Sequence, residues 1–309
     1  MGTANTNSGL SLQRRKTIFW CWLFMLPAIS LFLIFQVYPL FANGYYSLFD
    51  WNGIGASFRY IGLRNYSRVL SDSYFWNALG NNYLFMLWVV PLQLVFGLVL
   101  ALALNTGCEK IRNTYRTAFF IPVICTASVV GIIMSFLLGF DGPVTAALSA
   151  LGLCEPGQNW ISDGDTAMAS VIIVYAWKNV GMNMVYWIAA LQAVPEELHE
   201  AARIDGANGR QTFFHVTLPL IVPTGAVITV MNVISSLKIF DLAKTMTDGG
   251  PFFKTDFVSL YMYRYAFSAS FGQPRMGYAA AAGMIFGLSA IIVAVLVSVC
   301  LTHSRKKAA

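Results

Sequence analysis

Charged residues are scarce in this chain. Only 11% of its 309 residues are charged and 57% are hydrophobic, whereas a soluble domain carries about 25% charged residues. The apolar residues gather in several runs of about 20, the length that a helix needs to cross a hydrocarbon core about 30 Å thick. The composition excludes an ordinary soluble globular domain and predicts an all-α protein of the lipid bilayer.

Motifs for catalysis, metal binding and nucleotide binding are also missing. The three histidines (His199, His215 and His303) do not pair at metal-ligand spacing, and no serine-nucleophile motif is present. No G-x-x-x-x-G-K-[ST] phosphate-binding loop occurs, and the nearest string, GANGRQT at 206–212, lacks the lysine. We therefore expect a chain that is not an enzyme and holds no cofactor or metal, so that any nucleotide binds another protein.

Disulfide bonds and nucleic-acid binding are not expected either. The cysteines show no paired spacing, which argues against a disulfide framework. The net charge of +6 comes from basic residues scattered over short loops, without the basic face interleaved with aromatics that nucleic acid requires. The five cysteines are Cys21, Cys108, Cys125, Cys154 and Cys300.

The apolar runs predict six membrane spans. Pro27 is expected to bend the first span and Pro39 to end it. Residues 18–301 then form one transmembrane domain between two cytoplasmic tails, 1–17 and 302–309. The predicted spans are 18–41, 82–104, 119–140, 167–191, 219–242 and 278–301.

The distribution of Lys and Arg predicts that both termini face the cytoplasm, because cytoplasmic loops carry an excess of these residues. In that orientation the inner segments hold eleven of them: Arg14, Arg15, Lys16, Lys110, Arg112, Arg116, Arg203, Arg210, Arg305, Lys306 and Lys307. The outer segments are longer and hold seven: Arg59, Arg64, Arg68, Lys244, Lys254, Arg264 and Arg275.

The outer loops carry two further signals. Residues 44–76 are rich in Trp, Tyr and Phe, which favours an interfacial helix or hairpin at the membrane boundary, with a partner-docking surface as the alternative. Residues 248–251 read Asp-Gly-Gly-Pro, a strong turn signal. No internal repeat is visible, which argues against carriers built from inverted repeats.

The stretch 194–219 is the one charged helical segment between two apolar ones. Pro195 suits the first turn of a helix, and Glu196 and Glu197 favour the positive end of its dipole. Gly206 can end this helix in the left-handed conformation. These signals predict a helix at the cytoplasmic surface.

A second short helix is expected directly after it. This helix carries Arg210, Phe213 and Phe214, and Pro219 opens the next span. Two alanines beside Glu200 make a low ridge that can enter a groove on another protein, with Asp205 offering a further charge. The alternative is a solvated loop that only joins two spans.

A family resemblance separates these alternatives. Glu200-Ala201-Ala202, three residues, Gly206, nine residues and Val216-Thr217-Leu218-Pro219 resembles the signature loop of binding-protein-dependent ABC importer permeases. The family pattern is Glu-Ala-Ala, three residues, Gly, nine residues, Ile, any residue, Leu-Pro. Val216 in place of isoleucine is the only departure. The stretches LQAVPEELHEAARIDGANGRQTF, FRYIGLRNYSRVLSD and MTDGGP are similar to the carbohydrate-uptake branch.

The resemblance implies a six-helix permease in a bacterial plasma membrane that carries a sugar, oligosaccharide or related polyol. Its implied partners are a second permease subunit (more often a different chain), two ATPases that bind ATP and Mg, and an extracytoplasmic solute-binding protein. The loop 194–218 becomes the coupling loop that receives the motion of the ATPases. The residues it assigns to coupling are Glu200, Ala201, Ala202, Asp205, Gly206, Leu218 and Pro219.

Polar residues inside the spans are candidates for the solute pathway, because such residues usually face a bundle interior or a cavity. Interhelical hydrogen bonding is the alternative. An ion- or proton-coupled carrier or channel working without ATP would need a carboxylate deep in a span, and only Asp241, near a span end, is available. The pathway candidates are Trp177, Asn179, Asn183, Asn232, Ser235, Lys238 and Asp241.

Overall fold

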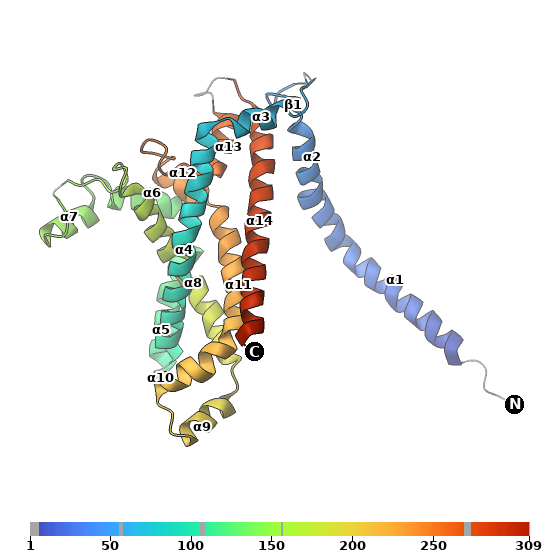
Figure 1. Cartoon of the computed structure of the whole chain (residues 1–309), viewed down its shortest axis with the longest axis vertical. Helices are drawn as coiled ribbons and strands as arrows, with labels where there is room; N and C mark the ends of the chain where they lie inside the picture. The colour runs from blue at the N-terminus through green and yellow to red at the C-terminus, as the bar shows by residue number, and fades with distance from the viewer. Residues whose placement is uncertain (1–5, 56–57, 106–108, 156, 269–272, 309) are drawn as a thin grey trace.

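A computed structural model describes residues 6–55, 58–105, 109–155, 157–268 and 273–308, and the regular secondary structure within them is helical apart from one small hairpin (Figure 1). The helices before the first long loop are α1 (Thr6–Phe32), a π-helical turn (Leu33–Val37) and α2 (Tyr38–Tyr46). The hairpin pairs β1 (Phe49–Asp50) with β2 (Arg59–Tyr60) in antiparallel register.

The remaining helices follow in chain order. They are α3 (Arg64–Leu70), α4 (Ser73–Asn105), α5 (Glu109–Ile124), α6 (Ala127–Leu137), α7 (Pro143–Ala150), α8 (Ala167–Gln192), α9 (Glu196–Ile204), α10 (Gly209–Thr212), a second π turn (Phe213–Thr217), α11 (Leu218–Leu237), α12 (Asp241–Met246), α13 (Val258–Phe267) and α14 (Met276–Ala308).

Four helices are long and apolar enough to cross a membrane, or five if the bent α5–α6 pair counts as one span. The sequence predicted six. The difference is α8, which matches the predicted fourth span in its bounds but carries Lys178, Asn179 and Asn183 in its middle. The four are Arg14–Tyr46, Ser73–Leu104, Gly209–Leu237 and Met276–Leu301.

The helices continue beyond several of the predicted span ends. The helix of the first span begins at Thr6, inside the predicted tail 1–17, and α14 runs through the predicted tail to Ala308. Residues 1–5, 309 and Cys108 lie outside the described residues. So do the side chains of Lys110, Arg112, Arg305, Lys306 and Lys307.

Two prolines that were expected to mark span ends lie inside continuous helices. Pro39 does not end the first helix, and Pro219 does not open the fifth. Each proline comes two residues after a five-residue π-helical turn, Leu33–Val37 or Phe213–Thr217. A proline clashes with the carbonyl four residues earlier in an α-helix. The wider π turn accommodates the ring, so each helix continues.

The third and fifth predicted spans are broken. α5 and α6 meet at an angle of 96° across Cys125 and Thr126, where the Thr126 side chain caps α6 by accepting a hydrogen bond from the amide of Val129. α11 ends at Leu237, and α12 begins only at Asp241. α6 packs on α12, where Gly131 leaves no room for a Cβ atom beside Thr245.

The core follows α4, which packs along α8 through the middle of the molecule (Figure 1). Phe85, Val171 and Phe257 are buried in one cluster, and Trp187, Ile188 and Ile221 in another toward α9. α1 diverges from this bundle, and none of its most apolar window is buried. The body of the protein is therefore formed by α4 to α14.

One end of the bundle is closed by the hairpin and α3, which lie opposite α9 (Figure 1). Asn65 ties the hairpin to α3 by donating to the carbonyls of Ser47 and Phe49. Asp72, at the start of α4, accepts hydrogen bonds from the hydroxyls of Tyr261 (2.6 Å) and Tyr278 (3.0 Å). Residues 44–76 therefore contain both a helix and a hairpin, and their position at the membrane boundary stays a prediction.

Candidate functional site

α9 is a short charged helix with no buried residue. Glu196 and Glu197 occupy its first turn and Arg203 its last, the arrangement that complements a helix dipole. Pro195 is the N-cap residue, with φ −60° and ψ 134°, and so lies one position before the first turn, in which it was predicted. The predicted surface helix is confirmed, with its start shifted by one residue.

The turn after α9 is a Schellman motif. Gly206 has φ +77°, its amide donates to the carbonyl of Arg203 (3.1 Å), and the amide of Ala207 donates to the carbonyl of Ala202 (2.9 Å). This pair of bonds satisfies carbonyls that a helix end would otherwise leave unpaired. The predicted role of Gly206 as a left-handed helix terminator is confirmed.

The chain re-enters a helix two residues later through a capping box, in which Asn208 accepts from the amide of Gln211 and Gln211 accepts from the amide of Asn208. The predicted second short helix does not stand alone. It is the first part of the continuous helix Gly209–Leu237. α9 is therefore joined by a rigid turn to one of the long apolar helices.

α9 projects beyond the bundle at one end of the molecule (Figure 1). A cavity of about 260 Å³ lies behind it, lined by His199 and Arg203 on α9 and by Leu102, Phe213 and Thr217 on the long helices. Glu200, Ala201 and Asp205 are exposed, and Ala202 is half-buried. The ridge predicted from the alanines is accessible on its outer side.

The signature residues divide into two groups. Those from Glu200 to Gly206 lie on or next to the projecting helix. Leu218 and Pro219 lie in the long helix, where Leu218 packs against the cluster of Trp187 and Ile221 and Pro219 is exposed. The segment thus connects an exposed surface to the packed interior of the bundle.

Sequence reasoning missed Ile204, the last residue of α9. Its side chain is 86% exposed, and among the large hydrophobic residues that the structure describes only Phe252 is more exposed. The available signal was its spacing, since Ala201 and Leu198 lie three and six residues earlier and Leu198 is also exposed. Together they give α9 an apolar stripe on an accessible surface.

Among the predicted pathway residues, Asn183 on α8 and Asn232 on α11 meet directly. Nδ2 of Asn232 donates to Oδ1 of Asn183 at 2.6 Å, and both residues are buried. Asn179 donates within its own helix, to the carbonyl of Tyr175. Asn183 and Asn232 therefore form an interhelical hydrogen bond, which the sequence analysis gave as the alternative to a role in the solute pathway.

The other pathway candidates surround the break between α11 and α12. Ser235, Lys238 and Asp241 are exposed, and Tyr175 of α8, which the sequence did not single out, donates to the carbonyl of Ser235 (3.2 Å). Trp177 is also exposed and lines an apolar groove of about 350 Å³ with the α5–α6 corner. No group of His, Cys, Asp and Glu that could hold a metal ion occurs among the described residues.

Comparison with known proteins gives a consistent result. The family described as binding-protein-dependent transport system inner membrane component matches residues 17–304. The probable ABC transporter permease protein YurN of Bacillus subtilis is 36% identical over 84% of this chain and 88% of its own. The multiple sugar-binding transport system permease protein MsmF of Streptococcus mutans is 31% identical over 93% and 97%.

A solved structure has the same fold. It is a bacterial alginate ABC transporter in complex with an alginate pentasaccharide-bound periplasmic protein. One of its chains matches with a TM-score of 0.80, at 24% identity, over 95% of this chain and 98% of that one.

Proposed function

Because this chain belongs to the family of binding-protein-dependent transport system inner membrane components, we propose that α9 receives the motion of an ATPase and transmits it to the membrane helices. The chain is the transmembrane permease of an ABC sugar importer. It is a transport subunit, and ATP hydrolysis belongs to a separate ATPase, which would hold the ATP and Mg.

The observation that carries this proposal is the construction of the α9 segment. Its charged and apolar residues are accessible, a Schellman turn fixes its end, and a capping box joins it to the helix Gly209–Leu237. Because α9 is rigid, exposed and joined directly to this long helix, a force applied to α9 is transmitted to the helix and is not lost in movement of a flexible loop. Glu200, Ala201, Ala202, Asp205 and Gly206 would contact the ATPase, and Leu218 and Pro219 would carry the displacement inward.

The membrane arrangement follows from the same proposal. Six spans result if α8 and the bent α5–α6 pair cross the membrane along with the four long helices. α8 is 26 residues long, which at about 1.5 Å per residue exceeds a hydrocarbon core of about 30 Å. The excess of Lys and Arg in the segments on the α9 side supports cytoplasmic termini, so α9 faces the cytoplasm.

The solute pathway would run along the exposed polar surface near the break between α11 and α12. Ser235, Lys238 and Asp241 are accessible there, and polar side chains at membrane depth are costly unless they face a cavity or a partner. A second permease subunit, covering this surface and the Trp177 groove, would complete the pathway. The solute is a sugar, oligosaccharide or related polyol, delivered by an extracytoplasmic solute-binding protein.

Reconstitution tests the proposal. The chain is co-expressed with a second permease and ATPase, purified as a complex and placed in proteoliposomes with candidate solute-binding proteins and a panel of sugars. We expect a cognate binding protein and its sugar to stimulate ATP hydrolysis and drive ATP-dependent sugar uptake. Uptake that needs no ATP and stops with a proton uncoupler would contradict the proposal and support the ion- or proton-coupled carrier.

A further inference from the structure

The cavity behind α9 lies where two of the long apolar helices reach their ends. Leu102 is near the end of the apolar span Ser73–Leu104, and Phe213 is near the start of the helix Gly209–Leu237. α9 itself has no buried residue, so its side chains leave the space between it and these helices unfilled. Because both apolar spans end at the cavity, it lies at the boundary between the hydrocarbon core and water.

The basic side chains of the cavity come from one face of α9. His199 and Arg203 both line it, and they are four residues apart, a spacing that places two side chains on the same face of a helix. The described residues that line the cavity include no Asp or Glu. The acidic residues of α9, among them Glu197 and Glu200, therefore do not neutralise this face.

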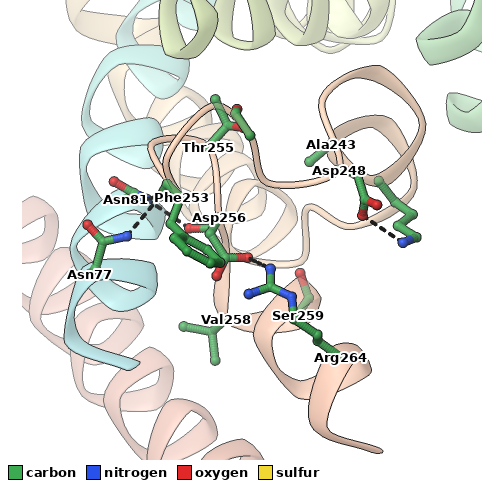
Figure 2. Close-up of polar contacts among 12 residues, drawn as sticks. Asn77, Asn81, Ala243, Asp248, Phe253, Thr255, Asp256, Val258, Ser259 and Arg264 are labelled. Atoms are coloured by element: carbon green, nitrogen blue, oxygen red, sulfur yellow. Dashed lines mark hydrogen bonds and ion pairs between the residues drawn. The ribbon is translucent and has the colours of Figure 1, made fainter. Parts of the chain in front are cut away.

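Neither of these two basic side chains has an ion-pair partner among the described residues. Other cations of the same chain do. The Arg264 guanidinium lies 2.6 Å from Oδ1 of Asp256, and Nζ of Lys244 lies 2.6 Å from Oδ1 of Asp248 (Figure 2). The basic face of α9 is thus available to an anion that comes from outside the described part of the chain.

The helix start beside the cavity has the same electrostatic preference. Gly209, the first residue of the helix Gly209–Leu237, lines the cavity, and a Cβ atom placed on it would meet nothing within 4 Å. Its backbone is therefore open to a ligand, and the positive end of a helix dipole favours an anion. The hydroxyls of Thr212 and Thr217 already donate to backbone carbonyls.

The rest of the cavity wall is apolar. It includes Leu102, Leu191 and Phe213. Phe213 packs edge-on against Phe214, with 5.1 Å between the ring centroids, and the Phe214 side chain is 59% exposed. An apolar surface therefore continues from the cavity to the outside of the long helix.

We propose that this cavity binds the phosphate headgroup of an anionic phospholipid, with Arg203 and His199 as the phosphate ligands and the acyl chains outside, along Phe213 and Phe214. Its volume of about 260 Å³ is several times the about 30 Å³ of one water, which is room for a headgroup and not for the chains. Arginine suits phosphate because its planar guanidinium donates two parallel N–H bonds. Basic pockets at the cytoplasmic ends of membrane helices are typical headgroup sites.

A lipid bound in this way would connect α9 to the bundle. Its phosphate would contact α9, and its glycerol and upper chain carbons would contact the ends of α4 and of the helix Gly209–Leu237, which supply the apolar wall. The inference goes beyond the proposed function, because lipid binding at this cavity requires neither an ATPase nor a solute.

Arg203→Gln tests the lipid site, because it removes the charge and keeps most of the side-chain length. The purified full-length chain in detergent micelles is titrated with phosphatidylglycerol and with phosphatidylcholine of the same chain length, and bound lipid is counted by native mass spectrometry. We expect the wild type to prefer phosphatidylglycerol, and Arg203→Gln to bind it about tenfold more weakly, the effect of losing a hydrogen bond to a charged group. The melting temperature without added lipid should stay unchanged, because Arg203 is exposed.

Arg210→Gln is the matched control. Arg210 is exposed and does not line the cavity, so its loss changes the net charge equally and should leave phosphatidylglycerol binding unchanged. Glycerol phosphate serves as a probe that carries a phosphate without chains. It should bind the wild type more weakly than phosphatidylglycerol by about tenfold or more, because it buries no apolar surface.

Three results would overturn the lipid site. The first is unchanged phosphatidylglycerol affinity in Arg203→Gln, and the second is an equal loss in Arg203→Gln and Arg210→Gln, which would be a general effect of charge. The third is glycerol phosphate binding as tightly as phosphatidylglycerol, which would assign the cavity to a soluble phosphate compound. The proposed function fails by a different result, in which no solute-binding protein and sugar stimulate ATP hydrolysis by the wild-type complex.

Discussion

Asn232 on α11 and Asn183 on α8 share a buried side-chain hydrogen bond of 2.6 Å. The two helices approach closely beside it, because Gly225 of α11 leaves no room for a Cβ atom beside Trp187 of α8. Gly97 brings α4 equally close to Asn183. The polar contact therefore lies in a tightly packed interface near the middle of the bundle.

Removing one asparagine should cost more than the hydrogen bond itself is worth. Asn232→Ala leaves a buried amide oxygen without its donor, which costs about 1–3 kcal/mol. In a double-mutant cycle, Asn183→Ala and Asn232→Ala should show a coupling energy of about 0.6–1.7 kcal/mol, the range for such bonds between membrane helices. Unfolding of the purified chain in mixed micelles measures both quantities.

Ser289→Ala is a suitable control for this cycle, because the Ser289 hydroxyl donates within its own helix, to the carbonyl of Phe286. It should show no coupling with Asn183→Ala. Strictly additive effects of the two asparagine substitutions would contradict the interhelical bond.

Gly206→Ala should weaken coupling through backbone strain alone. A Cβ atom on Gly206 meets nothing within 4 Å, but the residue has φ +77°, so alanine there costs about 1–2 kcal/mol. We expect the end of α9 to fray, and sugar uptake per ATP hydrolysed to fall while the complex still assembles.

Gly209→Ala provides the comparison for that variant. A Cβ atom on Gly209 also meets open space, and this glycine is not at a positive φ. It should retain wild-type coupling. If both variants lost the same amount of sugar uptake per ATP hydrolysed, the loss would come from the added methyl group and not from the left-handed backbone at Gly206.

Ile204→Ala should weaken binding of the ATPase. An exposed apolar residue at the end of a charged helix is a typical interface anchor, and its truncation should reduce ATPase affinity about five- to thirtyfold, as measured by titration of ATPase onto the permease. Ile54→Ala removes a comparably exposed residue (74%) in the loop between β1 and β2 and should have no effect. Unaltered ATPase binding by Ile204→Ala would remove Ile204 from the interface.

Asp256 should make stability depend on pH. Burial raises the pKa of its carboxyl to about 6 from the ordinary 3.8, and Arg264 offsets only part of this effect. Oδ2 of Asp256 is buried and accepts no hydrogen bond from the described residues. Because the folded state then holds the proton more tightly than the unfolded state, the contribution of this group is most favourable below about pH 4 and is lost as pH rises to about 6.

One pKa unit corresponds to about 1.4 kcal/mol, so the effect is large enough to appear in melting temperatures between pH 4 and pH 7. Asp256→Asn should flatten that part of the profile relative to the wild type. Asp165→Asn, which changes an exposed carboxylate, should leave it in place. Parallel profiles for the wild type and Asp256→Asn would contradict the pKa shift.

Much of the α9 segment was predictable because its signals are local. Glu196 and Glu197 complement the helix dipole in the first turn. The turn at Gly206 and the pair of Asn208 and Gln211 satisfy backbone groups within one or two turns. Run length likewise predicted most membrane helices. Ile204 was missed because the pattern-based argument followed charges and small residues.

The helix breaks were not predictable in the same way. Pro39 and Pro219 are typical helix punctuation, yet each follows a π turn that lets the helix continue. The 96° bend between α5 and α6 and the break before Asp241 lie inside apolar runs that are long enough for one continuous span. The length of these runs therefore gives no indication of a break. They coincide with a tertiary contact, since α6 packs on α12.

The sequence by itself determined that this chain belongs in a membrane and, to within one residue, where its one charged helix begins and ends, because hydrophobic run length and helix capping act over neighbouring residues. Only the tertiary structure decided which polar groups meet, such as Asp72 with Tyr261 and Asn81 with the carbonyl of Asp256, which are 189 and 175 residues apart. It also decided that Phe253 is half-buried and Phe252 exposed. Such pairings depend on how the helices pack. Phe252 and Phe253 are adjacent and of the same type, so the sequence does not indicate which of the two is half-buried.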